Sequence, residues 1–455
     1  MKYDVIVLGG GPGGYLVAER AGQAGLKTLC IEARAFGGVC LNEGCIPSKT
    51  LLNSAKIYDH ALHGAKFGVS ASGVSIDQKA VIQRKNKVVD TLVSGVKAAL
   101  KAHGVTMIQG YGEILGRDKD GFSVSVGGEV YKGSYLIVAT GSAPVIPPIP
   151  GVKEGLEAGT VLTNREILDL EVIPESLVVI GGGVIGLEMA AYYNSVGSKV
   201  TVIEMLDHIA GPTDREISSM LQKAYEKKGV AFKLGSKVIS VGKDSVTFET
   251  AGKSETVGAE KILLSIGRRA QTAGFGLEKL GVITERGAIK TDRTCLTNIP
   301  NLYAVGDVNG VSMLAHTAYR EAEVAVNNII GKRDIMRYGA IPSVIYTYPE
   351  AAGVGETEES AKAKGISYVT GKVSMLYSGR FVAENEGETG ICKVLAEKET
   401  GKIIGAHMLG AYASEFILSA GIMVETEMTV SAAKEIVFPH PTVCEVLREA
   451  IFAIK

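Results

Sequence analysis

Two glycine-rich turns constrain the fold of this chain more than any other feature. An apolar run at residues 3–8 leads into a GxGxxG turn, and a second apolar run at 27–32 ends in an acid. The same arrangement returns at residues 177–204. At a constant offset of 172 residues the paired positions are Gly9 and Gly181, Gly11 and Gly183, Gly14 and Gly186, and Glu32 and Glu204. Strand, glycine turn and helix in this order predict two Rossmann-like dinucleotide-binding domains.

Each position of the fingerprint has a physical reason. The first glycine makes the tight turn, the second lets the backbone approach a pyrophosphate, and the third lets helix pack on strand. The amides at the helix N-terminus then receive the phosphates. A terminal carboxylate accepts hydrogen bonds from ribose hydroxyls but repels a 2′-phosphate, so Glu204 favours NAD over NADP. One match alone could be an ordinary glycine turn with a solvent-facing glutamate, but two in register favour nucleotide binding.

Two thiols lie just downstream of the first fingerprint. Cys40 and Cys45 are close enough in sequence to bridge, which predicts a redox-active disulfide. Pro47 suits the first position of a helix, so the helix amides would face the Cys45 sulfur and stabilise its thiolate. A static loop disulfide or two idle thiols are the alternatives. Static bridges concentrate in small stapled domains, and this chain is long and poor in cysteine.

Composition excludes several classes of partner. Six cysteines in 455 residues, with no CxxC pair and no His-rich tract, argue against a disulfide framework and against a zinc site. A reducing compartment fits best, and with no charged leader and no apolar run of membrane-spanning length we expect a cytoplasmic protein that does not bind membranes. A net charge of -1 and a pI near 6.7 give no electrostatic footprint for nucleic acid.

Turn residues and apolar runs indicate the domain boundaries. The strand at 135–140 is followed by a proline-rich stretch at 144–151 that cannot continue sheet or helix, which predicts a crossover. The strand at 261–266 closes the second nucleotide domain, and the fingerprints stop near residue 338. We therefore expect one nucleotide-binding domain at 1–143 and 267–337, a second at 144–266, and a C-terminal α/β domain at 338–455.

The motifs together resemble the flavin-linked disulfide reductases. The resemblance covers essentially the whole chain and is carried by Cys-Leu-Asn-x-Gly-Cys-Ile-Pro-Ser-Lys at 40–49, the two fingerprints, Thr-Gly-Ser at 140–142, Gly-Asp at 306–307, and His-Pro-Thr at 440–442. The string at 40–49 is close to that of the members that oxidise dihydrolipoamide with NAD. Glutathione and mercuric reductases more often carry Val-Asn-Val-Gly-Cys-Val-Pro and use NADPH.

The resemblance implies where the cofactors bind. It places FAD at the first fingerprint with Glu32, and NAD at the second with Glu204. Residues 1–143 with 267–337 would then be the FAD-binding domain, 144–266 the NAD-binding domain, and 338–455 the dimerisation domain. The other positions implied for FAD are Lys49, Gly112, Thr140, Gly141, Ser142, Asp307, Met313, Leu314, Ala315 and His316. Those implied for NAD are Glu188, Val238 and Gly267, with Glu188 approaching Lys49 beside the flavin ring. Without the resemblance, Lys49 would be interpreted as a solvated helix lysine and Asp307 as a cap or turn acid.

His440 is the candidate acid-base group. It lies between two prolines, and imidazole is the side chain whose ordinary pKa suits proton transfer near neutral pH. Thr442 and Glu445 have the T-x-x-E form of a capping box, so Glu445 has a purely structural interpretation too. The resemblance implies that His440, held by Glu445, reaches the cysteines of the other subunit in a homodimer. Cys444 is either an oxidation-prone thiol beside this site or a small buried filler.

The activity implied by the resemblance is oxidation of protein-bound dihydrolipoamide with reduction of NAD+. The dithiol would attack Cys40, and Cys45 would pass the electrons to FAD. The partners implied are the lipoyl-bearing acyltransferase of a 2-oxoacid or acetoin dehydrogenase complex, or the glycine cleavage H protein. The alternatives are a related NAD(P)H-dependent reductase of another disulfide, an NADH oxidase of the same architecture, and a nucleotide-binding electron carrier without disulfide chemistry.

Overall fold

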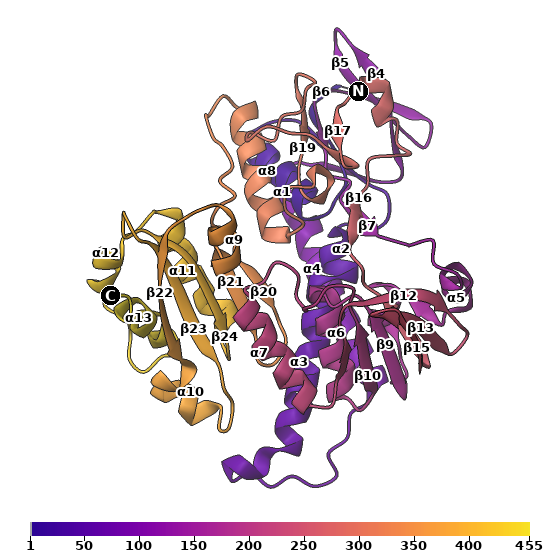
Figure 1. The fold of residues 1–455 in the computed structure, drawn as a ribbon. Helices are drawn as coiled ribbons and strands as arrows, with labels where there is room; N and C mark the ends of the chain where they lie inside the picture. The colour runs from indigo at the N-terminus through magenta and orange to yellow at the C-terminus, as the bar shows by residue number, and fades with distance from the viewer. Residues whose placement is uncertain (1) are drawn as a thin grey trace. The chain divides into compact units, whose positions relative to one another are not determined.

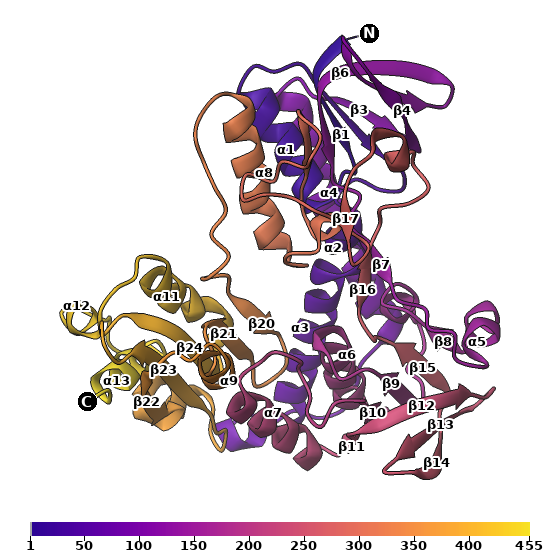
Figure 2. The same cartoon turned by 45° about the horizontal axis from the view of Figure 1, so that its top comes forward.

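A computed structural model describes residues 2–455, which form two compact units (Figures 1 and 2). The first unit contains the residues up to 50, with 82–145 and 267–337. The second contains 51–81, 146–266 and 338–455. Two helices, α3 (Cys45–Leu62) and α4 (Gln78–Ala102), have residues in both units. Each unit is described by itself.

The first unit is built on a seven-stranded sheet of order β3-β2-β1-β6-β5-β4, with β19 on β6. Its strands are β1 (Lys2–Leu8), β2 (Thr28–Glu32), β3 (Thr106–Gln109), β4 (Gly112–Asp118), β5 (Gly121–Val126), β6 (Glu129–Val138) and β19 (Leu302–Ala304). Strands β1, β2, β3, β6 and β19 run parallel, as expected for a βαβ unit, and β4–β6 form an antiparallel meander. The apolar faces of these strands form the core of the unit.

Helices of the first unit lie beside this sheet. They are α1 (Pro12–Gln23), α2 (Gly38–Glu43), the start of α3, most of α4, and α8 (Ala315–Ile329), and Figure 1 shows α1 and α8 side by side. Small elements complete the unit: β7 (Ser142–Pro144), β16 (Arg268–Ala270), β17 (Thr284–Glu285), β18 (Ala288–Ile289), η3 (Leu277–Leu280) and η4 (Asp307–Asn309). The 3-10 turn η4 directly follows Gly306 and precedes α8.

The second unit repeats the βαβ arrangement. Its parallel sheet has the order β11-β10-β9-β15-β8, and a three-stranded antiparallel sheet β12-β13-β14 accompanies it. The strands are β8 (Val161–Leu162), β9 (Ser176–Ile180), β10 (Lys199–Ile203), β11 (Ala231–Lys233), β12 (Ser236–Val241), β13 (Ser245–Thr250), β14 (Lys253–Gly258) and β15 (Lys261–Leu264). The helices are η1 (Gly64–Phe67), α5 (Val152–Ala158), η2 (Glu166–Asp169), α6 (Val184–Ser195) and α7 (Arg215–Lys227).

The C-terminal part of the second unit is an antiparallel sheet of order β20-β21-β24-β23-β22. Its strands are β20 (Ser343–Ile345), β21 (Ala351–Gly355), β22 (Tyr368–Ser374), β23 (Ile391–Glu397) and β24 (Ile403–Leu409). Its helices are α9 (Glu358–Ala363), η5 (Met375–Tyr377), α10 (Gly379–Glu384), α11 (Ala413–Glu425), α12 (Val430–Lys434) and α13 (Glu445–Phe452). Helices α11 and α13 pack on this sheet and bury one apolar core with it.

The predicted fold class is confirmed: two Rossmann-like nucleotide-binding sheets and a C-terminal α/β domain are present. Two local predictions were wrong. Helix α3 begins at Cys45, two residues before Pro47, because the first-turn amides have no intrahelical acceptor and a proline is tolerated there. Sheet pairing also continues past Gly141, since β7 pairs with β16 and its Pro144 lies at the end of a two-stranded edge. No helix among residues 2–455 is long and apolar enough to span a bilayer.

Candidate functional site

The two fingerprints have matching local geometry. Gly9 and Gly181 end their strands with φ of +107° and +104°, and a Cβ there would lie 2.1 Å from the carbonyl oxygen of Ala139 and 2.5 Å from that of Ser265. Only glycine tolerates both the torsion and the close approach. Helices α1 and α6 then start one residue after Gly11 and Gly183, which cap them. Their first amides point out of the turn, where a pyrophosphate binds in such units.

The acid of each repeat holds its glycine turn. Glu32 accepts a hydrogen bond from the amide of Gly10 at 2.7 Å, and Glu204 accepts one from Gly182 at 2.6 Å. The second oxygen of Glu204 accepts from Leu206 N–H at 2.8 Å, and Glu32 makes the corresponding bond at the same offset. Both side chains are only half-buried. The carboxylates are therefore loop anchors, and they retain acceptor capacity for a ribose hydroxyl.

Open space and an unpaired donor show that the residues fit a dinucleotide. A Cβ on Gly183 would meet nothing within 4 Å, so this backbone is open to close approach by a ligand. Among the described side chains, the buried Nδ2 of Asn309 lacks a hydrogen-bond partner within the protein, although its oxygen accepts from Val311 N–H. Asn309 follows Asp307 in η4, next to a predicted FAD residue. Such a donor is available to a bound cofactor.

The two cysteines lie on consecutive helices. Cys40 is on α2 and Cys45 is the first residue of α3, with only the Gly44 break between the helices. Both are half-buried thiols, and a hydrogen bond joins their sulfurs. That bond, followed by burial and the charge of the neighbouring thiolate, raises the pKa of Cys40, whereas the charge of Lys49 lowers it. The sequence thus brings the two sulfurs together at the start of a helix, as predicted.

Lys49 lies one turn into α3, close enough to Cys40 for its charge to act on the thiol. Its side chain is half-buried. Glu188 lies on α6 in the second unit, is 3% exposed, and accepts a hydrogen bond from Tyr346 N–H at 3.1 Å. The predicted approach of Glu188 to Lys49 remains a prediction.

A polar cluster in the first unit joins two predicted FAD residues. Ser142 donates to Asp307 at 2.5 Å, and Arg268 donates to the hydroxyl of Ser142 at 2.8 Å and to its carbonyl at 2.7 Å. Burial lowers the pKa of Arg268, and the charges of Asp307, Glu43 and Cys45 oppose that change. Arg268 is half-buried, and its position just after a predicted domain limit gave no sign that it belongs to this cluster.

Two tyrosines near the cysteines were also missed. The hydroxyls of Tyr15 on α1 and Tyr319 on α8 lie 2.5 Å apart. Burial raises the pKa of Tyr15, and hydrogen bonding to Tyr319 and the nearby charges of Cys40 and Cys45 add to that rise. Burial likewise raises the pKa of Tyr319. These phenols therefore stay protonated beside the thiol pair. The only sequence signal was the position of Tyr15, directly after the fingerprint.

The remaining predicted FAD residues lie at the carboxyl edge of the first sheet or at the start of α8. Gly112 begins β4, where a Cβ would lie 2.7 Å from a methyl of Leu8. Thr140 donates to the carbonyl of Gln271 at 2.6 Å, and Gly141 accepts from the amide of the same residue at 2.9 Å. Met313, Leu314, Ala315 and His316 form the entry to α8, with Leu314 at the cap position and His316 exposed.

Of two predicted NAD residues, Gly267 has an open backbone and Val238 has a buried side chain. Gly267 has φ of +115° and open space at its Cβ position, and its carbonyl accepts from Val145 N–H at 3.0 Å. Val238, on β12, is 8% exposed, and its side chain packs in an apolar core that includes Phe248 and Ile262. Only the backbone of Val238 is thus suited to a ligand contact.

His440 and Glu445 form a hydrogen-bonded pair. The Nδ1 of His440 lies 2.7 Å from one carboxylate oxygen of Glu445, and the other oxygen accepts from Thr442 N–H at 2.8 Å. That backbone bond, and then His440, lower the pKa of Glu445 despite some burial. Half of the predicted capping box forms, but the Thr442 hydroxyl donates to Pro439 instead and α13 begins at Glu445. The Glu445 carboxylate therefore fixes the loop through Thr442 N–H and also holds the imidazole of His440.

Cys444 is a partly buried thiol. It packs against the C-terminal core, and burial raises its pKa while a hydrogen bond with Ser419 opposes the rise. A raised pKa lowers the thiolate fraction and hence reactivity. The structure therefore favours the filler interpretation. Among residues 2–455, no group of three or more His, Cys, Asp or Glu side chains is arranged to hold a metal ion.

Comparison with known families agrees with this geometry. A family model described as pyridine nucleotide-disulphide oxidoreductase matches residues 3–322, and the model for that family's dimerisation domain matches residues 341–451. The chain belongs to the pyridine nucleotide-disulphide oxidoreductase family. Members are flavin-dependent oxidoreductases, so the class predicted from the motifs is confirmed.

Particular relatives are similar over nearly their whole length. The dihydrolipoyl dehydrogenase of Bacillus subtilis is 39% identical, covering 99% of this chain and 98% of the relative. Dihydrolipoyl dehydrogenase 1 of Arabidopsis thaliana mitochondria is 39% identical, covering 99% and 90%. Among solved structures, LpdA of Mycobacterium tuberculosis has a TM-score of 0.89 at 26% identity, with 99% of each chain covered. The flavoprotein disulfide reductase RclA of Escherichia coli gives 0.88 at 26% identity, with 100% of each covered.

Proposed function

We propose that this chain oxidises protein-bound dihydrolipoamide to lipoamide and reduces NAD+ to NADH, with FAD and the Cys40–Cys45 pair between the two substrates. The observation that carries the proposal is the contact between the two sulfurs at the start of α3, in the same unit as the first fingerprint. A dithiol substrate requires a protein disulfide that can open and close. The near full-length likeness to dihydrolipoyl dehydrogenases supports this substrate over other disulfides.

In the proposed reaction, His440, Cys40 and Cys45 have separate roles. His440 takes a proton from one thiol of dihydrolipoamide, and the thiolate attacks the Cys40 sulfur, which breaks the Cys40–Cys45 bond and forms a mixed disulfide. The second substrate thiol then displaces Cys40, so lipoamide leaves as a disulfide and both protein sulfurs are reduced. Cys45 stays charged at the helix N-terminus. Bound FAD would accept the electron pair from the two sulfurs and pass a hydride to NAD+.

The cofactors would be held by the predicted residues. The first fingerprint, Glu32, the Ser142–Asp307 pair and the entry to α8 would bind FAD, and the second fingerprint with Glu204 would bind NAD. Support comes from the equal geometry of the two turns and from the unpaired Asn309 amide. The domain limits at 143, 266 and 337 remain part of the proposal.

We infer that the active form is a homodimer. His440 has 76% of its side chain exposed, which suits a group that acts on another subunit. Exposed apolar side chains accompany it on the C-terminal part, the domain that matches the dimerisation model. They are Leu376, Tyr377, Leu418, Ile422 and Val437. The lipoyl-bearing partner is the acyltransferase of a 2-oxoacid or acetoin dehydrogenase complex or the glycine cleavage H protein, and a cytoplasmic location fits the sparse cysteines.

A panel of substrates tests the proposed reaction. The purified flavoprotein is assayed with dihydrolipoamide and NAD+ or NADP+, and in the other direction with NADH or NADPH and glutathione disulfide or mercuric ion. We expect turnover with dihydrolipoamide and NAD+ only, with parallel lines in double-reciprocal plots because the disulfide separates the two half-reactions. Faster turnover of glutathione disulfide with NADPH would instead support the alternative reductase.

Mixing two inactive variants tests the shared active site. Cys45→Ser removes the thiol from one subunit and His440→Gln removes the base from the other, so a hybrid dimer keeps one complete site. Random exchange of equal amounts makes half of the dimers hybrids, and we expect roughly a quarter of the wild-type activity to return. The measurement is dihydrolipoamide oxidation after subunit exchange, with dimer content followed by analytical ultracentrifugation. Absence of recovery despite confirmed exchange would contradict catalysis across subunits.

A further inference from the structure

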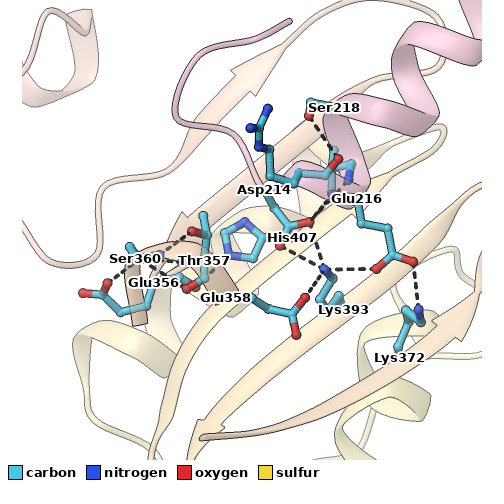
Figure 3. A network of polar contacts seen from close by, with 12 residues as sticks. Asp214, Glu216, Ser218, Glu356, Thr357, Glu358, Ser360, Lys372, Lys393 and His407 are labelled. Atoms are coloured by element: carbon cyan, nitrogen blue, oxygen red, sulfur yellow. Dashed lines mark hydrogen bonds and ion pairs between the residues drawn. The ribbon is translucent and has the colours of Figure 1, made fainter. Parts of the chain in front are cut away.

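Lys393 is a cation buried inside the second unit. It lies on β23, its side chain is 1% exposed, and its ammonium contacts carboxylates from α9 and from the start of α7 (Figure 3). Both oxygens of Asp214 accept from it at 2.9 Å, Glu358 accepts at 3.1 Å, and Glu216 lies at 3.0 Å. Glu216 is also held by Lys372 of the neighbouring strand β22, at 2.8 Å. Every proton of the ammonium thus has an acceptor.

Asp214 connects this cation to a helix. It is fully buried and is the N-cap of α7, where its Oδ1 accepts from the amides of Glu216 at 3.0 Å and Ile217 at 3.3 Å. One carboxylate therefore both starts the helix and binds Lys393. Helix α7 packs on β21 and β24 of the same C-terminal sheet. The ion pair fixes where on that sheet the helix begins.

The cost of desolvating these charges indicates that the cluster serves to position the start of α7 and not mainly to stabilise the fold. Burying a charged pair costs free energy that its Coulomb attraction barely returns, so apolar side chains could hold helix and sheet together equally well. Three carboxylates gathered around one buried ammonium, however, define a single position and a single rotation of the helix start. Such registry is the best-attested use of buried ion pairs.

A chain of backbone hydrogen bonds leads from Asp214 to the second fingerprint. Directly before the cap, Thr213 N–H donates to the carbonyl of Ala210 at 3.2 Å, and Ala210 N–H donates to the carbonyl of Gly182 at 2.8 Å. The amide of Gly182 in turn donates to Glu204. Ile209 is 1% exposed and Ala210 is 3% exposed, so the part of the segment that contacts the glycine turn is packed. The segment from 205 to 214 thus contacts the glycine turn through Ala210, and Lys393 holds its last residue, Asp214.

We propose that Lys393 is a positioning residue for nicotinamide dinucleotide binding: by holding Asp214 it fixes the 205–214 segment against Gly182 and Glu204. The inference rests on the proposed function, because it takes the second fingerprint as the NAD site. The buried ammonium of Lys393 is occupied by Asp214, Glu216 and Glu358, so it acts through these carboxylates and not as a ligand of the dinucleotide. We expect its effect to be confined to the NAD half-reaction, because these partners all belong to the unit that carries the second fingerprint.

The test replaces the cation with an apolar side chain of similar length. In Lys393→Met holoenzyme we expect Kd for NAD+, measured by calorimetry, and KM for NAD+ to rise about tenfold or more, because small misplacements of binding groups are costly. The KM for dihydrolipoamide and the FAD content should stay within about twofold. Lys372→Met, which removes the peripheral lysine of the same cluster, is the matched control and should leave NAD+ affinity unchanged. The double variant Lys393→Met with Asp214→Asn keeps an N-cap without a buried unpaired charge, so it should regain thermal stability while its NAD+ affinity stays low.

The possible outcomes distinguish a role of Lys393 in positioning the NAD+ site from a general effect on the stability of the fold. Unchanged NAD+ affinity in Lys393→Met would overturn the inference, and so would equal losses of NAD+ affinity, dihydrolipoamide affinity and FAD. If Lys393→Met fails to fold, the double variant and Asp214→Asn decide: wild-type NAD+ affinity in both overturns the inference. Glu204→Gln distinguishes the two levels of the argument. If it too leaves NAD+ binding intact, the proposed NAD site is wrong, whereas an effect of Glu204→Gln without one of Lys393→Met refutes only the positioning role.

Discussion

Replacing Cys45 by serine abolishes the oxidation of dihydrolipoamide, with a loss of about 10³-fold or more in kcat. Without this sulfur Cys40 has no partner, so the substrate dithiol meets no disulfide and the electrons have no route to the flavin. Because Cys45 starts α3, serine is well tolerated there and the fold should persist. The measurement is steady-state NADH formation, with FAD content and thermal melting recorded on the same sample.

A buried thiol elsewhere provides the control for Cys45. Cys392 lies on β23 with its side chain fully buried in the C-terminal core and takes no part in the proposed chemistry. Cys392→Ala should cost some stability but keep turnover within about threefold. If Cys45→Ser retains dihydrolipoamide oxidation near the wild-type rate, the assignment of the redox pair is wrong.

Replacing His440 by glutamine lowers kcat for dihydrolipoamide oxidation by about 10²-fold to 10⁴-fold. Glutamine can still donate a hydrogen bond to Glu445, so the loop stays in place while the base is lost. The pH dependence supplies the sharper readout. Because the pKa of Glu445 is lowered, its carboxylate is charged at neutral pH and stays charged to a lower pH than an ordinary glutamate. Protonation of Glu445 therefore does not cause a loss of activity near neutral pH.

The pH–rate profile for dihydrolipoamide oxidation should therefore change its shape in His440→Gln, because the proposed base is lost. Reduction of an artificial acceptor by NADH, which needs no thiol proton, should be unaffected and serves as the control. A variant with the wild-type profile, or one in which both reactions fall together, would remove His440 from the mechanism.

Much of the nucleotide-binding architecture was readable from sequence because its determinants are local. A glycine that needs positive φ, an apolar strand before it and a helix after it lie within about 30 residues, so steric rules alone predict the unit. Helix α6 begins directly after the second glycine turn, as the pattern predicts. The contact between Cys40 and Cys45 was likewise predictable, since a short turn joins their helices.

The polar clusters could not be predicted, because their members are far apart in sequence. Lys393 and Asp214 are separated by 179 residues, and Arg268 and Ser142 by 126. Locally, Lys393 looks like an outward-facing lysine in an apolar strand, and Asp214 like an ordinary helix cap. Their pairing depends on how α7 packs on the C-terminal sheet. The same reason explains the error at residues 142–144, where the partner strand β16 comes from a distant segment.

The two tyrosine hydroxyls beside the cysteines illustrate an intermediate case. Tyr15 follows the fingerprint directly and its burial on α1 is expected, but its partner Tyr319 comes from α8. The sequence pattern predicts the helix that carries Tyr15 but not the contact between the two hydroxyls. The environment of the thiol pair, including Lys49 and these phenols, therefore emerges only when the first unit is assembled.

The most direct test follows the sulfurs themselves through one catalytic cycle. The purified flavoprotein is held without oxygen, treated first with dihydrolipoamide and then with NAD+, and sampled by alkylation and mass spectrometry of the peptide containing Cys40 and Cys45 while the flavin absorbance is recorded. We expect an unlabelled disulfide at the start, two labelled thiols with a changed flavin spectrum after dihydrolipoamide, and the disulfide again after NAD+. Two thiols that are labelled equally at every stage, with an unchanging flavin spectrum, would contradict the account.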